Sequence, residues 1–105
     1  MANVMKLMKQ AATMQKDMAR VQEELAHKTV EFSSGGGMVT ATATGDGSVT
    51  RIKIDPRCVN PQETDLLEDL VLSAVDGAIK QSRAMASAEM GKITAGLGLA
   101  GLPGF

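Results

Sequence analysis

The sequence predicts a small α+β domain in which a long helix, a three-stranded antiparallel sheet and a second long helix follow one another, an αβββα order. Three observations lead to this fold class. Apolar residues recur in steps of three and four before residue 26 and after residue 61, whereas they alternate with polar residues between 28 and 55. The chain has 105 residues and neither an internal repeat nor a linker, so residues 1–105 are expected to form one domain.

The first helix is predicted over residues 3–26. Asn3 can cap its start, and neither Gly nor Pro interrupts it. Its apolar positions form a heptad seam with alternating steps of three and four: Val4, Leu7, Ala11, Met14, Met18, Val21 and Leu25. Such a helix is about 36 Å long, which exceeds what a small domain needs to cover its core. The helix is therefore expected to project or to meet a partner chain, with its seam in the core or in the dimer contact.

A meander of three strands is predicted over residues 28–55, because apolar and polar side chains alternate there with a period of two. The apolar members are Val30, Phe32, Val39, Ala41, Ala43, Ile52 and Ile54. Glycine-rich segments at 35–37 and 45–47 separate the strands, and glycine tolerates the positive φ of tight turns. The three strands should therefore pair antiparallel in chain order.

The second helix is predicted over residues 61–94. Asn60 is a suitable cap, Pro61 suits the first helical position, and Glu63 can reach back to the cap. The apolar stripe of this helix is broad enough to cover one face of the sheet; it consists of Leu66, Leu67, Leu70, Val71, Ala74, Val75 and Ala78. Repeated Gly and a Pro then predict a flexible tail over residues 96–105.

Composition excludes several classes of protein. The single cysteine rules out an internal disulfide, no apolar run approaches the roughly 18 residues of a membrane span, and the first residues lack the apolar core of a signal peptide. A cytoplasmic protein is expected.

His27 and Cys58 are the only His and Cys and lie in separate segments, so no catalytic pair is predicted. The acidic residues of the second helix lack a His or a binding loop, so neither a metal nor a cofactor is expected.

Basic residues gather near the N-terminus, although the net charge is −1. The cations of the first helix lie opposite its seam, again in steps of three and four; we call Lys6, Lys9, Lys16 and Arg20 the basic stripe. A solvated outer face and a row of phosphate contacts both fit this pattern. Like charges on one helix face, and cations near a helix N-terminus, lower stability unless a ligand uses them, which favours phosphate contact. Lys80 and Arg83, with no acid between them, form a weaker companion patch.

The absence of Tyr and Trp favours duplex DNA as the ligand. Proteins that bind single strands commonly stack bases on aromatic rings, whereas duplex phosphates require only cations and give little sequence preference. Two alternatives stay open. The same cations suit RNA, and the seam, in a chain with eight Met residues, suits an adaptor or structural protein that binds a partner protein.

Several short segments occur in an order that resembles one known family. They are Leu7-Met8-Lys9-Gln10-Ala11, Met14-Gln15, Gln22-Glu23-Glu24-Leu25, Ile54-Asp55-Pro56, Leu67-Glu68-Asp69-Leu70-Val71 with Ala74, and Leu102-Pro103-Gly104-Phe105. Each segment is unspecific alone, but their joint order across nearly the whole chain is similar to the YbaB/EbfC family of nucleoid-associated proteins.

This resemblance implies a homodimer of helix–sheet–helix subunits with projecting helices, which binds DNA without catalysis and organises the chromosome in the bacterial cytoplasm. It implies no membrane partner and no small-molecule substrate. It further implies DNA contacts from charged residues of both long helices, which correspond here to Lys9 and Lys16 with Lys6 and Arg20 beside them, followed by Lys80 and Arg83. The acidic overall balance departs from that pattern, so weak and salt-sensitive binding is expected.

Overall fold

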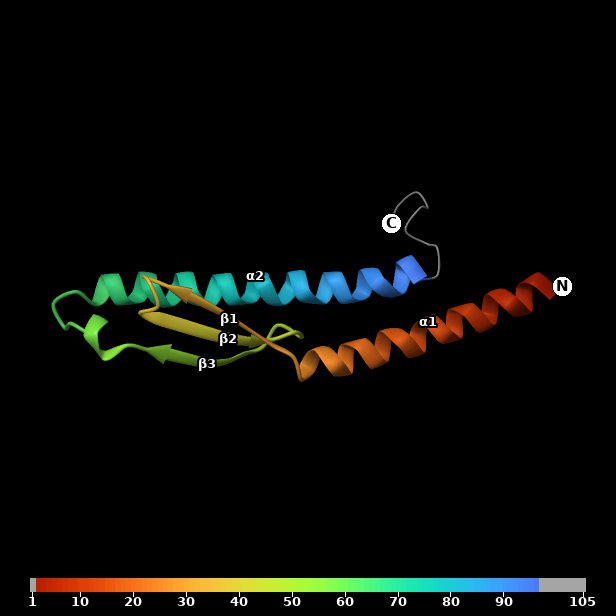
Figure 1. Ribbon diagram of the computed structural model, residues 1–105, viewed down its shortest axis with the longest axis horizontal. Helices are drawn as coiled ribbons and strands as arrows, with labels where there is room; N and C mark the ends of the chain where they lie inside the picture. Colours follow the sequence, from red (N-terminus) through yellow and green to blue (C-terminus); the bar gives the residue numbers. More distant parts are fainter. Residues whose placement is uncertain (1, 97–105) are drawn as a thin grey trace.

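The computed structural model describes residues 2–96, and its elements follow the predicted αβββα order (Figure 1). They are helix α1 (Ala2–Ala26), strands β1 (Thr29–Ser34), β2 (Val39–Thr44) and β3 (Val49–Ile54), the short 3-10 helix η1 (Pro56–Cys58) and helix α2 (Thr64–Gly96). Strand β2 is central and pairs antiparallel with both β1 and β3. The predicted α+β class is therefore confirmed. The tail expected to be flexible lies, beyond Gly96, outside the described residues.

Helix α2 packs across one face of the sheet and forms the core with it. The fully buried apolar residues of this core are small: Val39, Ala41 and Ala43 on β2, and Ala74 and Ala78 on α2. Small side chains let the helix axis approach the central strand closely, so larger side chains such as Phe32 and Leu70 pack at the margins. The core is therefore centred on β1 and β2, and β3 lies at its edge.

Gly77 of α2 marks the closest approach of the helix to β1. A Cβ added at Gly77 would overlap Cδ1 of the Phe32 ring. We therefore expect Gly77→Ala to lower the free energy of unfolding by about 2 kcal/mol, the usual cost of overpacking a core. Urea unfolding followed by circular dichroism measures this change.

Gly91 of the same helix provides a matched control, because within residues 2–96 no atom beyond its chain neighbours and the local helix backbone lies within 4 Å of the Cβ that alanine would add there. Gly91→Ala should raise the free energy of unfolding by about 0.5–1 kcal/mol through helix propensity alone. Equal stabilisation by both substitutions would contradict this prediction, because it would show that the Phe32 ring can pack beside an alanine at position 77.

The connection from β3 to α2 differs from the prediction at its end. The side-chain Oδ1 of Asn60 accepts a hydrogen bond from the backbone N–H of Gln62 (3.0 Å), and the backbone carbonyl of Asn60 accepts one from the backbone N–H of Glu63 (2.9 Å). These two hydrogen bonds close a turn instead of starting a helix. Helix α2 therefore begins at Thr64, three residues after the predicted start at Pro61. Sequence patterns place such ends poorly, because the same side chain can cap a turn or a helix.

Asp55 holds the start of this connection. Its carboxylate accepts hydrogen bonds from the guanidinium Nη2 of Arg57 (2.7 Å) and from the Arg57 backbone N–H (2.9 Å), and so caps η1. These hydrogen bonds lower the pKa of Asp55 to about 2, and the one from the Arg57 side chain has the larger effect. The carboxylate is therefore charged at every pH at which the protein is expected to function.

The molecule is long and thin. Its principal extents are 73 × 26 × 16 Å and its radius of gyration is 19.7 Å, whereas a compact domain of this size has a radius of about 13 Å. Helix α1 meets the rest of the fold at its C-terminal end, where Val21 and Leu25 are buried, and its N-terminal half projects past the end of α2 (Figure 1). A single chain thus leaves much of its apolar surface uncovered.

Candidate nucleic-acid interface

The basic stripe runs along the outer side of α1, and all four of its residues are exposed. Helical geometry puts these side chains roughly opposite the buried Val21 and Leu25. From Lys6 to Arg20 the stripe extends about 21 Å, at about 1.5 Å per residue. This length equals the rise of about six base pairs at about 3.4 Å each, so the stripe can follow a duplex backbone over roughly half a turn.

The cations of the stripe differ in their local partners. Arg20 lies between two carboxylates, with nitrogen–oxygen distances of 3.5 Å to Asp17 and 3.7 Å to Glu24. Within residues 2–96, by contrast, Lys6, Lys9 and Lys16 take part in no ion pair. The three lysines therefore present uncompensated positive charge on the projecting helix, while the charge of Arg20 is largely offset by its neighbours.

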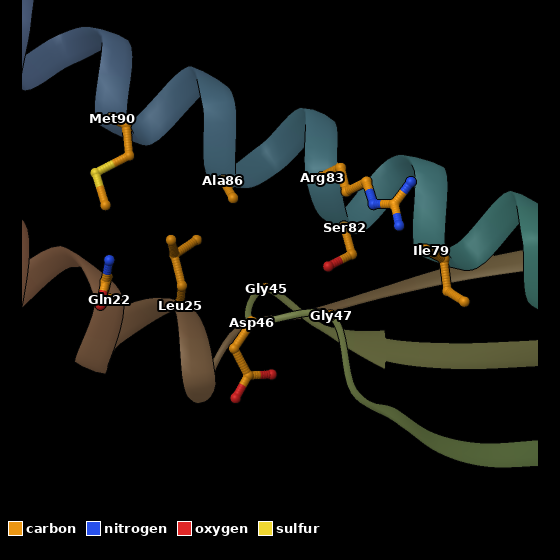
Figure 2. Close-up of a pocket in the computed structure, with 10 residues that line it drawn as sticks. All are labelled: Gln22, Leu25, Gly45, Asp46, Gly47, Ile79, Ser82, Arg83, Ala86 and Met90. Atoms are coloured by element: carbon orange, nitrogen blue, oxygen red, sulfur yellow. The ribbon is translucent and has the colours of Figure 1, made fainter.

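The companion patch on α2 is less suited to an anion than its sequence indicates. Lys80 forms an ion pair with Asp76 at 2.8 Å. No acid lies between Lys80 and Arg83 in the sequence, but Asp76, one helical turn before Lys80, compensates the charge of Lys80. Arg83 lines a hollow between α1, α2 and the turn from β2 to β3 (Figure 2). The structure therefore separates these two residues from the basic stripe.

This hollow has a volume of about 780 Å³. Leu25 and Met90 point toward each other across it, and the guanidinium of Arg83 lies along α2 toward Ile79 (Figure 2). Beside it, the buried Ser82 hydroxyl donates a hydrogen bond to the Thr44 carbonyl (2.6 Å), which ties α2 to the end of β2. The lining combines apolar side chains with the cation of Arg83, the carboxylate of Asp46 and the polar side chains of Gln22 and Ser82.

The heptad seam of α1 is only partly used within one chain. Val21 and Leu25 are buried and Met14 is half-buried, but Val4 and Leu7 are 56% and 63% exposed. Met18 is 36% exposed, and Ala11 is exposed as well. The seam thus enters the core at its C-terminal end and has no cover within the described residues toward its N-terminal end.

A second uncovered apolar surface lies where α2 meets β3. Ile52 and Ile54 pair with Ala41 and Val39 in the sheet register and share their helix-facing side, yet they remain 43% and 38% exposed. Helix α2 leans toward β1, where Gly77 meets Phe32, so its opposite flank is open.

That flank carries Leu72, which is 68% exposed, and Val75, and a shallow apolar groove runs along it. We call Val49, Ile52, Ile54, Leu72 and Val75 the β3–α2 face. Strand periodicity predicts that Ile52 and Ile54 face inward, but no pattern in the sequence shows that α2 leaves them uncovered.

Residues 2–96 lack the features of two other kinds of site. None of the helices there is long and apolar enough to cross a membrane. In the same part of the chain, no three His, Cys, Asp or Glu side chains cluster closely enough to hold a metal ion.

Both the fold and the sequence are similar to those of known proteins. The crystal structure of an uncharacterised protein from Helicobacter pylori is similar, with a TM-score of 0.69 over 78% of this chain and 86% of that one; at 21% identity this likeness shows the fold alone. The sequence profile of the YbaB/EbfC DNA-binding family matches residues 1–97. The chain belongs to this family.

Relatives of this YbaB/EbfC protein bear the name nucleoid-associated protein. One from Acetivibrio thermocellus is 51% identical over 102 residues, which cover 97% of this chain and 88% of the relative. Another from Moorella thermoacetica is 48% identical over 105 residues, covering 100% of this chain and 98% of the relative. The family consists of DNA-binding proteins and not of enzymes, so the predictions of the family, of a DNA partner and of a non-enzymatic protein are confirmed.

Proposed function

We propose that this chain acts as a homodimer in the bacterial cytoplasm, where it associates with the nucleoid and binds duplex DNA through phosphate contacts with little sequence preference. The basic stripe supplies those contacts, chiefly through Lys6, Lys9 and Lys16. Lys80 and Arg83 contribute less, because one is paired with Asp76 and the other lines the hollow beside the sheet. The same helices organise DNA by joining separate stretches of backbone.

One observation supports this proposal more than any other: three exposed lysines share one side of a projecting helix and have no ion-pair partner within the described residues. Unpaired like charges on one helix face lower its stability, by a few tenths of a kcal/mol per pair. Phosphates remove that repulsion and release the counterions condensed on DNA, which is the main source of affinity without sequence readout.

The β3–α2 face supports the dimer. It is an apolar surface on the helix side of the sheet, and a second copy of the same face is complementary to it in chemistry, since both lack charge at their centres. Contiguous exposed apolar surface of this kind marks protein contacts. Two joined chains present two basic stripes on one assembly, and both stripes can engage the same DNA.

The salt dependence of DNA binding tests the mechanism. If about six phosphates are neutralised, the affinity for a duplex should fall roughly a thousandfold between about 50 and 200 mM salt. Fluorescence anisotropy with two labelled duplexes of unrelated sequence measures both the slope and the sequence preference. An affinity that does not change with salt would contradict phosphate contact, and a large difference between the two duplexes would contradict low specificity.

Competition experiments separate this function from the two alternatives. Unlabelled duplex DNA should displace the labelled duplex at lower concentration than duplex RNA of the same length. Stronger competition by RNA would assign the stripe to RNA. Failure to bind any nucleic acid at about 50 mM salt, together with capture of a defined protein from nuclease-treated lysate, would assign the chain to the class of adaptor proteins.

A further inference from the structure

The uncovered N-terminal half of the α1 seam lies in line with the end of α2. The two helices run antiparallel. Ile93 of α2 and Asp17 and Val21 of α1 line a second hollow, separate from the one beside Arg83. Each further residue of α2 therefore lies beside an earlier residue of α1. Gly96, one turn after Ile93, reaches about the level of Met14, which is half-buried, whereas Leu7 beyond that level is 63% exposed.

The chain continues from this point with residues that suit the uncovered seam. Residues 97–105 contain no charged side chain and include four large apolar ones: Leu97, Leu99, Leu102 and Phe105. Nine residues reach up to about 30 Å when extended. The seam from Met14 back to Val4 needs only about 15 Å, so the segment is long enough to run along all of it.

We propose that residues 97–105 bind the N-terminal half of the α1 seam of the same chain, with their apolar side chains against Val4, Leu7 and Ala11. The contact buries apolar groups on both sides, which α1 and the segment would otherwise each expose to water. It also stiffens the projecting half of α1, on which Lys6 and Lys9 lie. The inference is independent of the proposed DNA binding.

A second copy of α1 suits this surface less well. Helix pairs in water need about three to four heptads, and the uncovered seam provides about two. Pairing two α1 helices would also bring two basic stripes onto one thin rod, and their like charges would oppose the pairing. The 97–105 segment has no charged side chain and is tethered at the correct end of the seam, so its effective concentration there is in the millimolar range.

Disulfide trapping in the full chain tests the contact. The protein contains one cysteine, so a Cys58→Ser background lets a single new pair be followed. In that background, Leu7→Cys with Leu102→Cys should form a disulfide within one chain under mild oxidation at low micromolar concentration. The matched control combines Thr13→Cys with Leu102→Cys, because Thr13 is exposed on the side of α1 away from the seam.

Thr13 is also nearer to Gly96 along the helix than Leu7 is, so chain length alone favours the control pair. We expect the Leu7 pair to close at least about tenfold faster than the Thr13 pair, since only a bound segment concentrates residue 102 at the seam. Equal rates would overturn the proposal by showing that the segment has no preferred side. A disulfide between two chains as the main product of the Leu7 pair would overturn it by assigning the seam to a second copy.

Discussion

Ile52→Asp is expected to turn the dimer into a monomer, with a rise in the dissociation constant of at least about a thousandfold, which corresponds to about 4 kcal/mol. Ile52 lies on the helix-facing side of β3 and is 43% exposed in the single chain, so a carboxylate there is solvated in the monomer. In the dimer, two such carboxylates would be buried within one apolar contact, and each buried unpaired charge costs several kcal/mol. Sedimentation equilibrium over a range of protein concentrations measures the change.

Met5→Asp is the matched control for this substitution. It places the same carboxylate on another exposed apolar position, 66% accessible and distant from the β3–α2 face, and should leave the mass of the assembly at two chains. The far-ultraviolet circular dichroism of both variants should equal that of the unmodified protein. If Ile52→Asp still sediments as two chains, the β3–α2 face is not the dimer contact.

Lys9→Gln combined with Lys16→Gln is expected to weaken binding to duplex DNA by about four-thousandfold at about 0.1 M salt. Each phosphate contact changes the logarithm of the affinity by about 0.9 for each tenfold change in salt, so one contact contributes about eightfold at that concentration. Two lysines on each of two chains account for four contacts. The slope of log affinity against log salt should therefore also decrease by about four, which a salt titration measures directly.

Arg51→Gln combined with Lys53→Gln controls for the change in net charge. Both residues are exposed on the face of the sheet away from α2, and neither takes part in an ion pair within residues 2–96. The control removes the same charge from the protein but should change the affinity only a few-fold, through the weaker general attraction. A comparable loss in both variants would mean that the basic stripe is not the contact surface.

The Ile52→Asp variant and the Lys9→Gln, Lys16→Gln variant are also expected to separate dimerisation from DNA contact. The lysine variant should remain a dimer, because Lys9 and Lys16 lie outside both apolar surfaces. The Ile52→Asp monomer should still bind DNA, but with about half the salt slope, since one chain presents one stripe. A monomer with an unchanged slope would show that only one stripe of the dimer engages DNA at a time.

Periodicity predicted the fold class correctly because it reports a property that each segment carries by itself. The heptad steps from Val4 to Leu25 require a helix, and the alternation of Val39, Ala41 and Ala43 with threonines requires a strand with one buried face. The turn at Asn60 was predicted less well, because its side chain closes a turn with Gln62 before α2 begins at Thr64. Local patterns thus fixed the elements but not their ends.

The sequence by itself determined that α1 has an apolar seam and, opposite it, a row of cations, since both follow from residue spacing on one helix. Only the tertiary structure decided how much of each is available. It buries Val21 and Leu25 but not Leu7, pairs Lys80 with Asp76, and leaves Ile52 uncovered because α2 leans toward β1. Burial and charge compensation depend on where a second element packs, and that position arises from contacts between segments far apart in the chain, which no local spacing records.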